Sequence, residues 1–72
     1  MKLHYYPETD SLYIELRPDA GVEAREVAPG IVADLDAKGR LVGLDIDHAS
    51  KNLDLKSLET EGLPAPIAAA GQ

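Results

Sequence analysis

The chain has 72 residues, of which 13 are acidic and seven are basic, so its net charge is −6. A chain this short forms one domain at most and buries only about 60% of its extended surface on folding. It contains no cysteine, which excludes both a disulfide and a thiolate zinc site. The acidic balance argues against direct binding of nucleic acid, which needs cationic side chains, and favours a basic protein partner.

The apolar residues set two further expectations. No apolar run approaches the roughly 20 residues that span a bilayer, and the N-terminal MKLHYYPETD lacks the apolar stretch of a signal peptide, so we expect a cytoplasmic protein away from membranes. The core residues are aliphatic, with three Tyr and no Phe or Trp. Because so thin a core gains from burying a second surface, the composition predicts a homodimer.

The first predicted element is a β-hairpin. Residues 2–6 and 11–17 are rich in strand formers, and the turn formers of residues 7–10 separate them. With these four residues as the loop, the predicted cross-strand pairs are Tyr6–Ser11, Tyr5–Leu12, Leu3–Ile14 and the opposite-charge pair Lys2–Glu15. One face then carries Leu3, Tyr5, Leu12, Ile14 and Leu16, and the reverse carries His4, Tyr6, Tyr13 and Glu15.

A weaker third strand is predicted over residues 22–27, after the turn of residues 18–21. Its three charged residues dilute the apolar pattern, and two registers against Leu16 fit equally well. The sequence Ala28-Pro29-Gly30 then predicts a bend or bulge, because proline lacks a ladder donor and glycine permits unusual dihedrals.

A second hairpin is predicted over residues 31–47, where apolar and polar residues alternate with period two on both sides of Lys38-Gly39. If Asp36 lies opposite Leu41, the remaining predicted pairs are Leu35–Val42, Ala33–Leu44 and Ile31–Ile46, all on one face. A slip of one residue would mix this apolar set with aspartates, so the pattern fixes the register. The predicted core is Leu12, Ile14, Leu35, Leu44 and Ile46.

After Asp47 the pattern becomes helical. Residues 48–51 predict one short turn of helix, and residues 52–59 a second, capped by Asn52 or Asp54, with Leu55 and Leu58 against the open sheet face. The predicted fold is therefore α+β, a small antiparallel β-meander of four to five strands covered by one or two short C-terminal helices. We assign residues 1–60 to this domain and residues 61–72, rich in Pro, Ala and Gly, to a flexible tail.

The candidate interaction surface is the face opposite the predicted core. It comprises the acidic residues Asp34, Asp36 and Asp45 and the ring-bearing residues His4, Tyr6 and Tyr13. No nucleophile, acid–base pair or phosphate loop is visible, so we expect no catalysis and no cofactor. The alternative is a small-ligand or metal-binding domain that uses the acidic face or the His4–Tyr13 region.

The metal alternative starts from a partial motif. Asp34, Asp36 and Gly39 have the spacing of a calcium loop, but Lys38 occupies its third acidic position and strands flank it in place of helices. The two histidines, His4 and His48, would bind a metal only if they met in space, which the spacing does not require. We therefore expect neither calcium nor zinc.

An extended pattern runs through YYPETDSLYIELRP and then through AREVAPGIVADLDAKGRLVGLDIDHASKNLDL. This pattern resembles the DUF2283 (YuzE-like) family of small bacterial proteins. The resemblance covers residues 1 to about 58 and implies a small β-rich domain with a short helical end. It assigns no activity and no site residues. Because some members are encoded beside small toxin-like proteins, it implies an antitoxin-like partner role.

Overall fold

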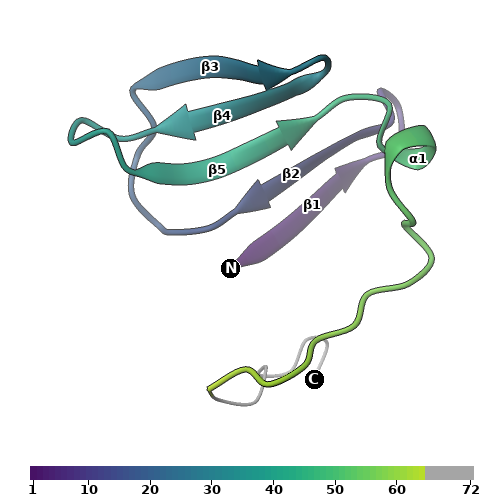
Figure 1. Cartoon of the computed structure of the whole chain (residues 1–72). Helices are drawn as coiled ribbons and strands as arrows, with labels where there is room; N and C mark the ends of the chain where they lie inside the picture. The colour runs from purple at the N-terminus through teal and green to yellow at the C-terminus, as the bar shows by residue number, and fades with distance from the viewer. Residues whose placement is uncertain (65–72) are drawn as a thin grey trace.

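The computed structural model describes residues 1–64 and shows one five-stranded antiparallel sheet with a single short helix (Figure 1). The elements are β1 (Lys2–Tyr6), β2 (Ser11–Glu15), β3 (Glu23–Ala28), β4 (Ile31–Leu35), β5 (Leu41–Ile46) and α1 (Ala49–Asn52). The fold is thus mostly β. The predicted antiparallel sheet and one short helix are present, but a helix of four residues does not make the fold α+β. Residues 65–72 of the predicted tail lie outside the described residues.

The strand order is β1-β2-β5-β4-β3, so the predicted simple meander is wrong. After β2 the chain crosses to the far edge, forms β3, and returns through β4 to insert β5 beside β2. This is a Greek key, in which three consecutive strands are joined by hairpins and a longer connection brings in the fourth. The third strand therefore pairs with β4 and has no register against Leu16.

The first hairpin has the predicted register at every position, from Lys2 opposite Glu15 to Tyr6 opposite Ser11. The amide of Thr9 donates to the carbonyl of Tyr6 (3.2 Å) and closes the loop. Asp10 ends the loop with a positive φ of 53°, which aspartate tolerates better than most residues. Loop length and strand alternation therefore determine this hairpin together.

The second hairpin agrees with the prediction at Ile31–Ile46 and Ala33–Leu44, but the pair Leu35–Val42 is wrong. The register shifts after Asp34, so that Leu35 lies opposite Leu41. Val42 is the extra residue of a β-bulge on β5, and its carbonyl accepts the amides of two consecutive residues of the chain after β2. Because Val42 is apolar and fits the alternation, nothing in the sequence marks this bulge.

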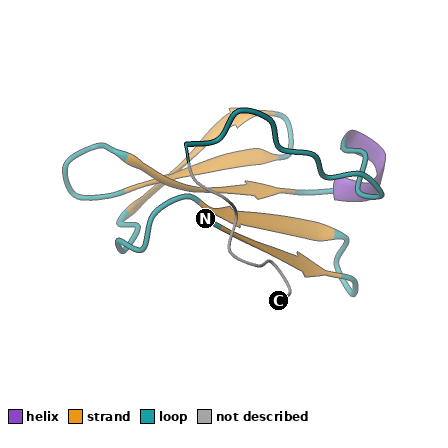
Figure 2. Ribbon diagram, turned by 90° about the horizontal axis from the view of Figure 1, so that it is seen from below, coloured by secondary structure: helices purple, strands orange, loops and turns teal. Residues whose placement is uncertain are grey.

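The main core lies on one face of the sheet. Leu12, Ile46 and Ala49 are buried together, with Ile14 and Ile31 packed against them. Of the predicted core, Leu12 and Ile46 are buried, whereas Ile14, Leu35 and Leu44 are only half-buried. The sheet forms a single twisted layer with residues 53–64 along one side (Figure 2), so within the described residues no second layer closes the core.

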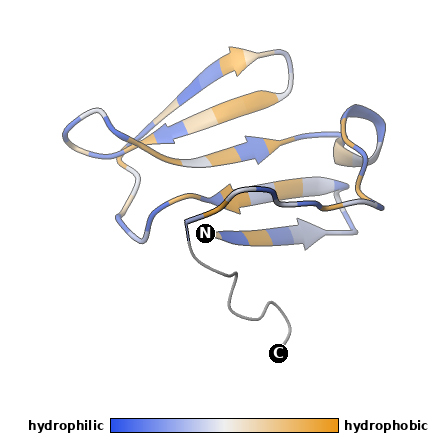
Figure 3. Cartoon of the chain, turned by 60° about the horizontal axis from the view of Figure 1, so that its bottom comes forward, coloured by the Kyte–Doolittle hydropathy of each residue, from blue (hydrophilic) through white to orange (hydrophobic). Residues whose placement is uncertain are grey.

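The short helix α1 agrees with the predicted helical turn, displaced by one residue, but the second helix over residues 52–59 is wrong. Leu53 is already extended (φ −132°, ψ 155°), and the Asp54 carboxylate accepts the amide of Lys56 (3.2 Å) in a local turn. An isolated helix of so few residues is marginal without packing. We call residues 53–58 the strap, because they run as a loop along the first hairpin (Figure 3).

No helix within residues 1–64 is long and apolar enough to cross a membrane.

Candidate functional site

The face of the sheet opposite the main core gathers carboxylates from three parts of the chain. Tyr13 on β2 lies across from Asp45 on β5, and Asp34 on β4 lies across from Gly43. Glu15 is the other neighbour of Gly43, and Asp47 follows β5 two residues after Asp45. We call Glu15, Asp34, Asp45 and Asp47 the acidic face.

Tyr13 crosses this face toward β4. Its ring lies so close over Gly43 that a Cβ at that position would be 2.6 Å from Cζ of the tyrosine. Burial raises the pKa of the Tyr13 hydroxyl above its usual value, and hydrogen bonding to the Asp34 carboxylate raises it further. Gly43 therefore has a packing role, because only a residue without a side chain leaves room for the ring to reach Asp34.

Within residues 1–64, no carboxylate of the acidic face takes part in an ion pair, although Lys2 lies across the hairpin from Glu15. The ion pairs among residues 1–64 join Arg17 or Arg40 to Asp19, Arg40 to Asp36, and Arg25 to Glu23, and none includes the acidic face. Partial burial raises the pKa of Asp45 above its usual value, and the negative charges of Asp47 and Asp34 add to this shift. The described part of the chain thus leaves a repulsive cluster that a cation would relieve.

The three ring-bearing residues of the predicted surface do share this face. His4 and Tyr6 of β1 stack with ring centroids 6.5 Å apart and planes inclined by 18°. His4 lies directly across from Tyr13, so the rings form a row beside the acidic face. Tyr6 keeps 49% of its surface exposed at the end of this row.

Asp36 does not belong to this surface, and its predicted exposure is wrong. Its side chain is only 7% exposed and organises the β4–β5 turn. The carboxylate accepts the amides of Lys38 (2.9 Å) and Arg40 (2.8 Å) and the Nε–H of Arg40 (2.8 Å). These bonds, first of all that from the Arg40 amide, hold the pKa of Asp36 below its usual value. The bulge at Val42 explains the change, because it places Asp36 in the turn.

The sequence did not reveal a second polar cluster, centred on Asp10. Its carboxylate accepts the hydroxyls of Tyr5 (2.7 Å) and Ser50 (2.7 Å) and the amide of Ser50 (3.1 Å), while its carbonyl accepts the Ala49 amide (2.9 Å). The Ser50 hydroxyl is the largest cause that lowers the pKa of Asp10, and Tyr5 is the next. The cluster ties the first hairpin to the start of α1. No spacing rule links residues 40 positions apart.

Within residues 1–64, no three His, Asp or Glu side chains come together as a group that could hold a metal ion. His4 lies in the row of rings, whereas His48 precedes α1 with a positive φ of 51°. The predicted alternative of a metal on the acidic face or near His4 therefore has no geometric support in this part of the chain.

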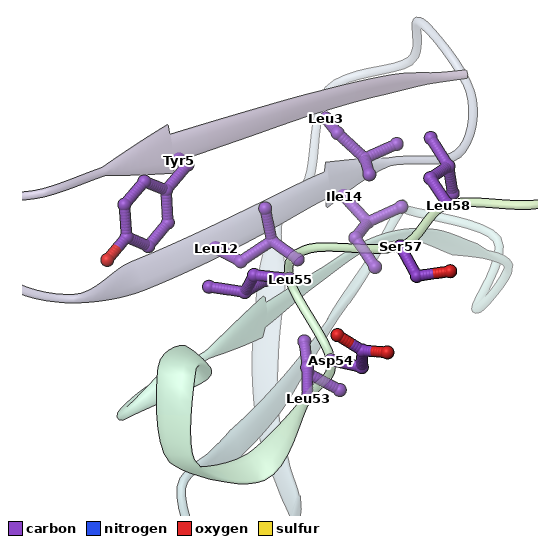
Figure 4. A pocket seen from close by; sticks show the side chains of 9 residues that line it. All are labelled: Leu3, Tyr5, Leu12, Ile14, Leu53, Asp54, Leu55, Ser57 and Leu58. Carbon is purple, nitrogen blue, oxygen red and sulfur yellow. The ribbon is translucent and has the colours of Figure 1, made fainter.

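The opposite, apolar face contains a groove of 610 Å³ between the strap and the first hairpin (Figure 4). The residues that line it are Leu3, Tyr5, Leu12, Ile14, Leu53, Asp54, Leu55, Ser57 and Leu58. The predicted position of Leu55 and Leu58 on this face is thus confirmed, although they reach it from a loop. The strap covers the hairpin without filling the space beneath it.

These features define a small antiparallel β-sheet protein with one acidic face and one partly covered apolar face. The chain belongs to the family described as protein of unknown function (DUF2283), whose family model matches residues 2–50. Comparisons with curated proteins and with solved structures give no match.

Proposed function

We propose that the protein is a non-catalytic interaction module whose acidic face binds a basic protein partner. The observation that carries the proposal is a set of four carboxylates that form no ion pair among the described residues, with Lys2 across from Glu15 as the one cation in register with them. A structural cluster of carboxylates is normally paired, because like charges close together oppose folding. Burial is the largest cause of the raised pKa of Asp45, and an external Lys or Arg would relieve the repulsion from Asp47 and Asp34 that raises it further.

The row of rings beside the acidic face supports the same function. Tyrosine combines a large apolar ring with a hydrogen-bonding hydroxyl and is enriched among the residues that dominate binding energy at protein interfaces. Tyr6 is half exposed and held by its stack with His4. A partner that places basic side chains on the carboxylates would therefore also contact a stacked aromatic surface.

The expected energetics are those of electrostatic steering. An exposed ion pair contributes about 0.2–1 kcal/mol, so four of them alone do not produce tight binding. Their main effect is on the association rate, which rises with complementary charge and falls as salt screens it. Affinity would then depend on the aromatic row and on contacts supplied by the partner.

The test begins with an affinity pull-down from the native host, followed by binding kinetics with the captured protein. The variant Glu15→Gln/Asp45→Asn/Asp47→Asn removes three charges from the acidic face and leaves Asp34 to hold Tyr13. The matched control, Glu8→Gln/Glu59→Gln/Glu61→Gln, removes three exposed charges elsewhere. We expect the first variant to slow association and to lose most of the salt dependence, whereas the control changes little.

Two results would contradict this function. Equal slowing in the two variants would mean that net charge, and not the acidic face, governs association. If the pull-down captured no protein, or captured an acidic one, the proposed function would be wrong.

A further inference from the structure

The two edges of the sheet differ in how they are protected against pairing with another strand. Exposed charged residues occupy half of β3, its register against β4 shifts between Glu26 and Ala28, and Pro29 follows it. Charges, bulges and proline are the usual means by which edge strands avoid pairing. The edge at β3 is thus blocked.

The edge at β1 has almost none of these features. It pairs with β2 over all five residues without a shift and contains no proline. Its apolar-face side chains, Leu3 and Tyr5, are each 45% exposed. Its one lysine, Lys2, lies across from Glu15 and is thereby opposed by a charge within the same sheet.

The backbone of β1 shows which groups face the open edge. The amide of Leu16 donates to the carbonyl of Val42 (2.9 Å), so even-numbered residues of β2 bond toward β5 and odd-numbered ones toward β1. In β1, the partners of those odd-numbered residues are Lys2, His4 and Tyr6. Leu3 and Tyr5 therefore direct their amides and carbonyls outward.

We propose that β1 pairs with β1 of a second copy, antiparallel about a two-fold axis at His4, so that the two sheets become continuous. The amide and carbonyl of Leu3 then bond to the carbonyl and amide of Tyr5 of the second copy. By symmetry, Tyr5 makes the same two bonds with Leu3 of the second copy. This register overlaps the whole strand. If the two-fold axis moved from His4 toward the loop of residues 7–10, Pro7 would enter the paired region. Pro7 has no backbone N–H, so the carbonyl opposite it would lose its hydrogen bond.

The side chains fit the same partner. On the apolar face, Leu3 of each copy would lie beside Tyr5 of the other, and this pair also lines the groove under the strap (Figure 4). Five large apolar residues of the groove remain exposed, with exposed fractions of 37–75%: Leu3, Tyr5, Leu53, Leu55 and Leu58. They present roughly 500 Å², over half of the ~800 Å² that each partner buries in a stable complex.

A single-cysteine cross-link tests both the pairing and its register. The chain has no cysteine, so His4→Cys introduces one thiol per copy. Across the axis, this non-hydrogen-bonded pair would have Cα atoms about 4.5 Å apart, within the range of a disulfide. We expect His4→Cys to form a covalent dimer under mild oxidation at micromolar concentration. Ala24→Cys is the control. Ala24 is exposed on the blocked edge strand β3, so this variant should remain a monomer under the same oxidation.

Sedimentation equilibrium tests the noncovalent dimer. Leu3→Lys and Val27→Lys each place a lysine at an exposed apolar residue of an edge strand, the first on β1 and the second on β3. We expect Leu3→Lys to weaken dimerisation at least tenfold while its circular dichroism stays that of a folded sheet, and Val27→Lys to retain the parent mass. A parent chain that is monomeric up to about 100 μM, or equal cross-linking of His4→Cys and Ala24→Cys, would overturn the proposal.

Discussion

Gly43 lies directly beneath the Tyr13 ring, and replacing it by Ala tests whether that contact organises the acidic face. A Cβ at Gly43 would be 2.6 Å from Cζ and 3.0 Å from Cε1 of Tyr13, whereas carbon atoms in contact prefer about 3.5–4.0 Å. The ring would have to retreat by about 1 Å, which takes its hydroxyl away from Asp34. Overpacking of this kind typically costs about 1–3 kcal/mol of the free energy of unfolding.

The decisive comparison is a double-mutant cycle measured by urea denaturation and circular dichroism. Valine keeps the strand preference at position 13 but lacks the ring atoms that approach Gly43. In the Tyr13→Val background, Gly43→Ala should therefore be neutral or stabilise by up to about 1 kcal/mol, since glycine weakens a strand interior. The coupling between the two positions should thus be about 1–4 kcal/mol.

Gly21 provides the control for this cycle. A Cβ there would lie 3.4 Å from Cβ of Asp34 and 3.5 Å from Cγ2 of Val42, which are ordinary contacts, so Gly21→Ala should change stability little. The same cost of Gly43→Ala in the parent and in the Tyr13→Val background would refute the assigned packing.

Three further predictions concern the Asp10 cluster, the acidic face and the core. The pKa of Asp10 is lowered in the folded protein, first of all by the Ser50 hydroxyl, so its contribution to stability is present above its unfolded pKa and is lost as the pH falls through the folded value. Ser50→Ala should therefore lower the urea midpoint at pH 7 and flatten the loss of stability in acid; an unchanged acid limb would contradict this. The pKa of Asp45 is raised instead, so folding favours its protonated form, and Asp45→Asn should raise the urea midpoint at pH 7 but not below the unfolded pKa. A lower midpoint at pH 7 would show that the carboxylate has a stabilising partner. Leu12→Ala should cost about 2–5 kcal/mol of unfolding free energy, whereas Leu58→Ala, at a residue 75% exposed, should cost little; similar losses in denaturation would mean that the strap is part of the core.

The sequence predicted local geometry well and long-range placement poorly. In the first hairpin, loop length, alternation and the Lys2–Glu15 pair all require the same register, and the structure has it. The second hairpin fails only where Val42 bulges, because an apolar bulge residue leaves the period intact. The position of β3 at the far edge depends on which strand β5 joins, and no single hairpin contains that information.

The candidate site divides in the same way. Asp34, Asp45 and the three ring-bearing residues share a face because strand alternation places them there. Asp36 was misplaced by the bulge, and its burial depends on the turn amides that its carboxylate accepts. The Asp10–Ser50 contact joins two ends of the chain that only the complete sheet brings together. Sequence patterns could therefore predict neither the burial of Asp36 nor the contact between Asp10 and Ser50.

The Greek key has a consequence for synthesis of the chain. Within residues 1–64, β5 is the last strand in chain order, yet it lies in the middle of the sheet and is the only strand there that pairs with both β2 and β4. Until it emerges from the ribosome, the nascent chain consists of two separate hairpins that share no edge, and an isolated two-stranded hairpin is marginally stable in water. Cooperative folding of the sheet must therefore wait until β5, which ends at Ile46, has been translated. A truncation before residue 41 would leave two unjoined hairpins with exposed strand edges, open to chaperones and proteases.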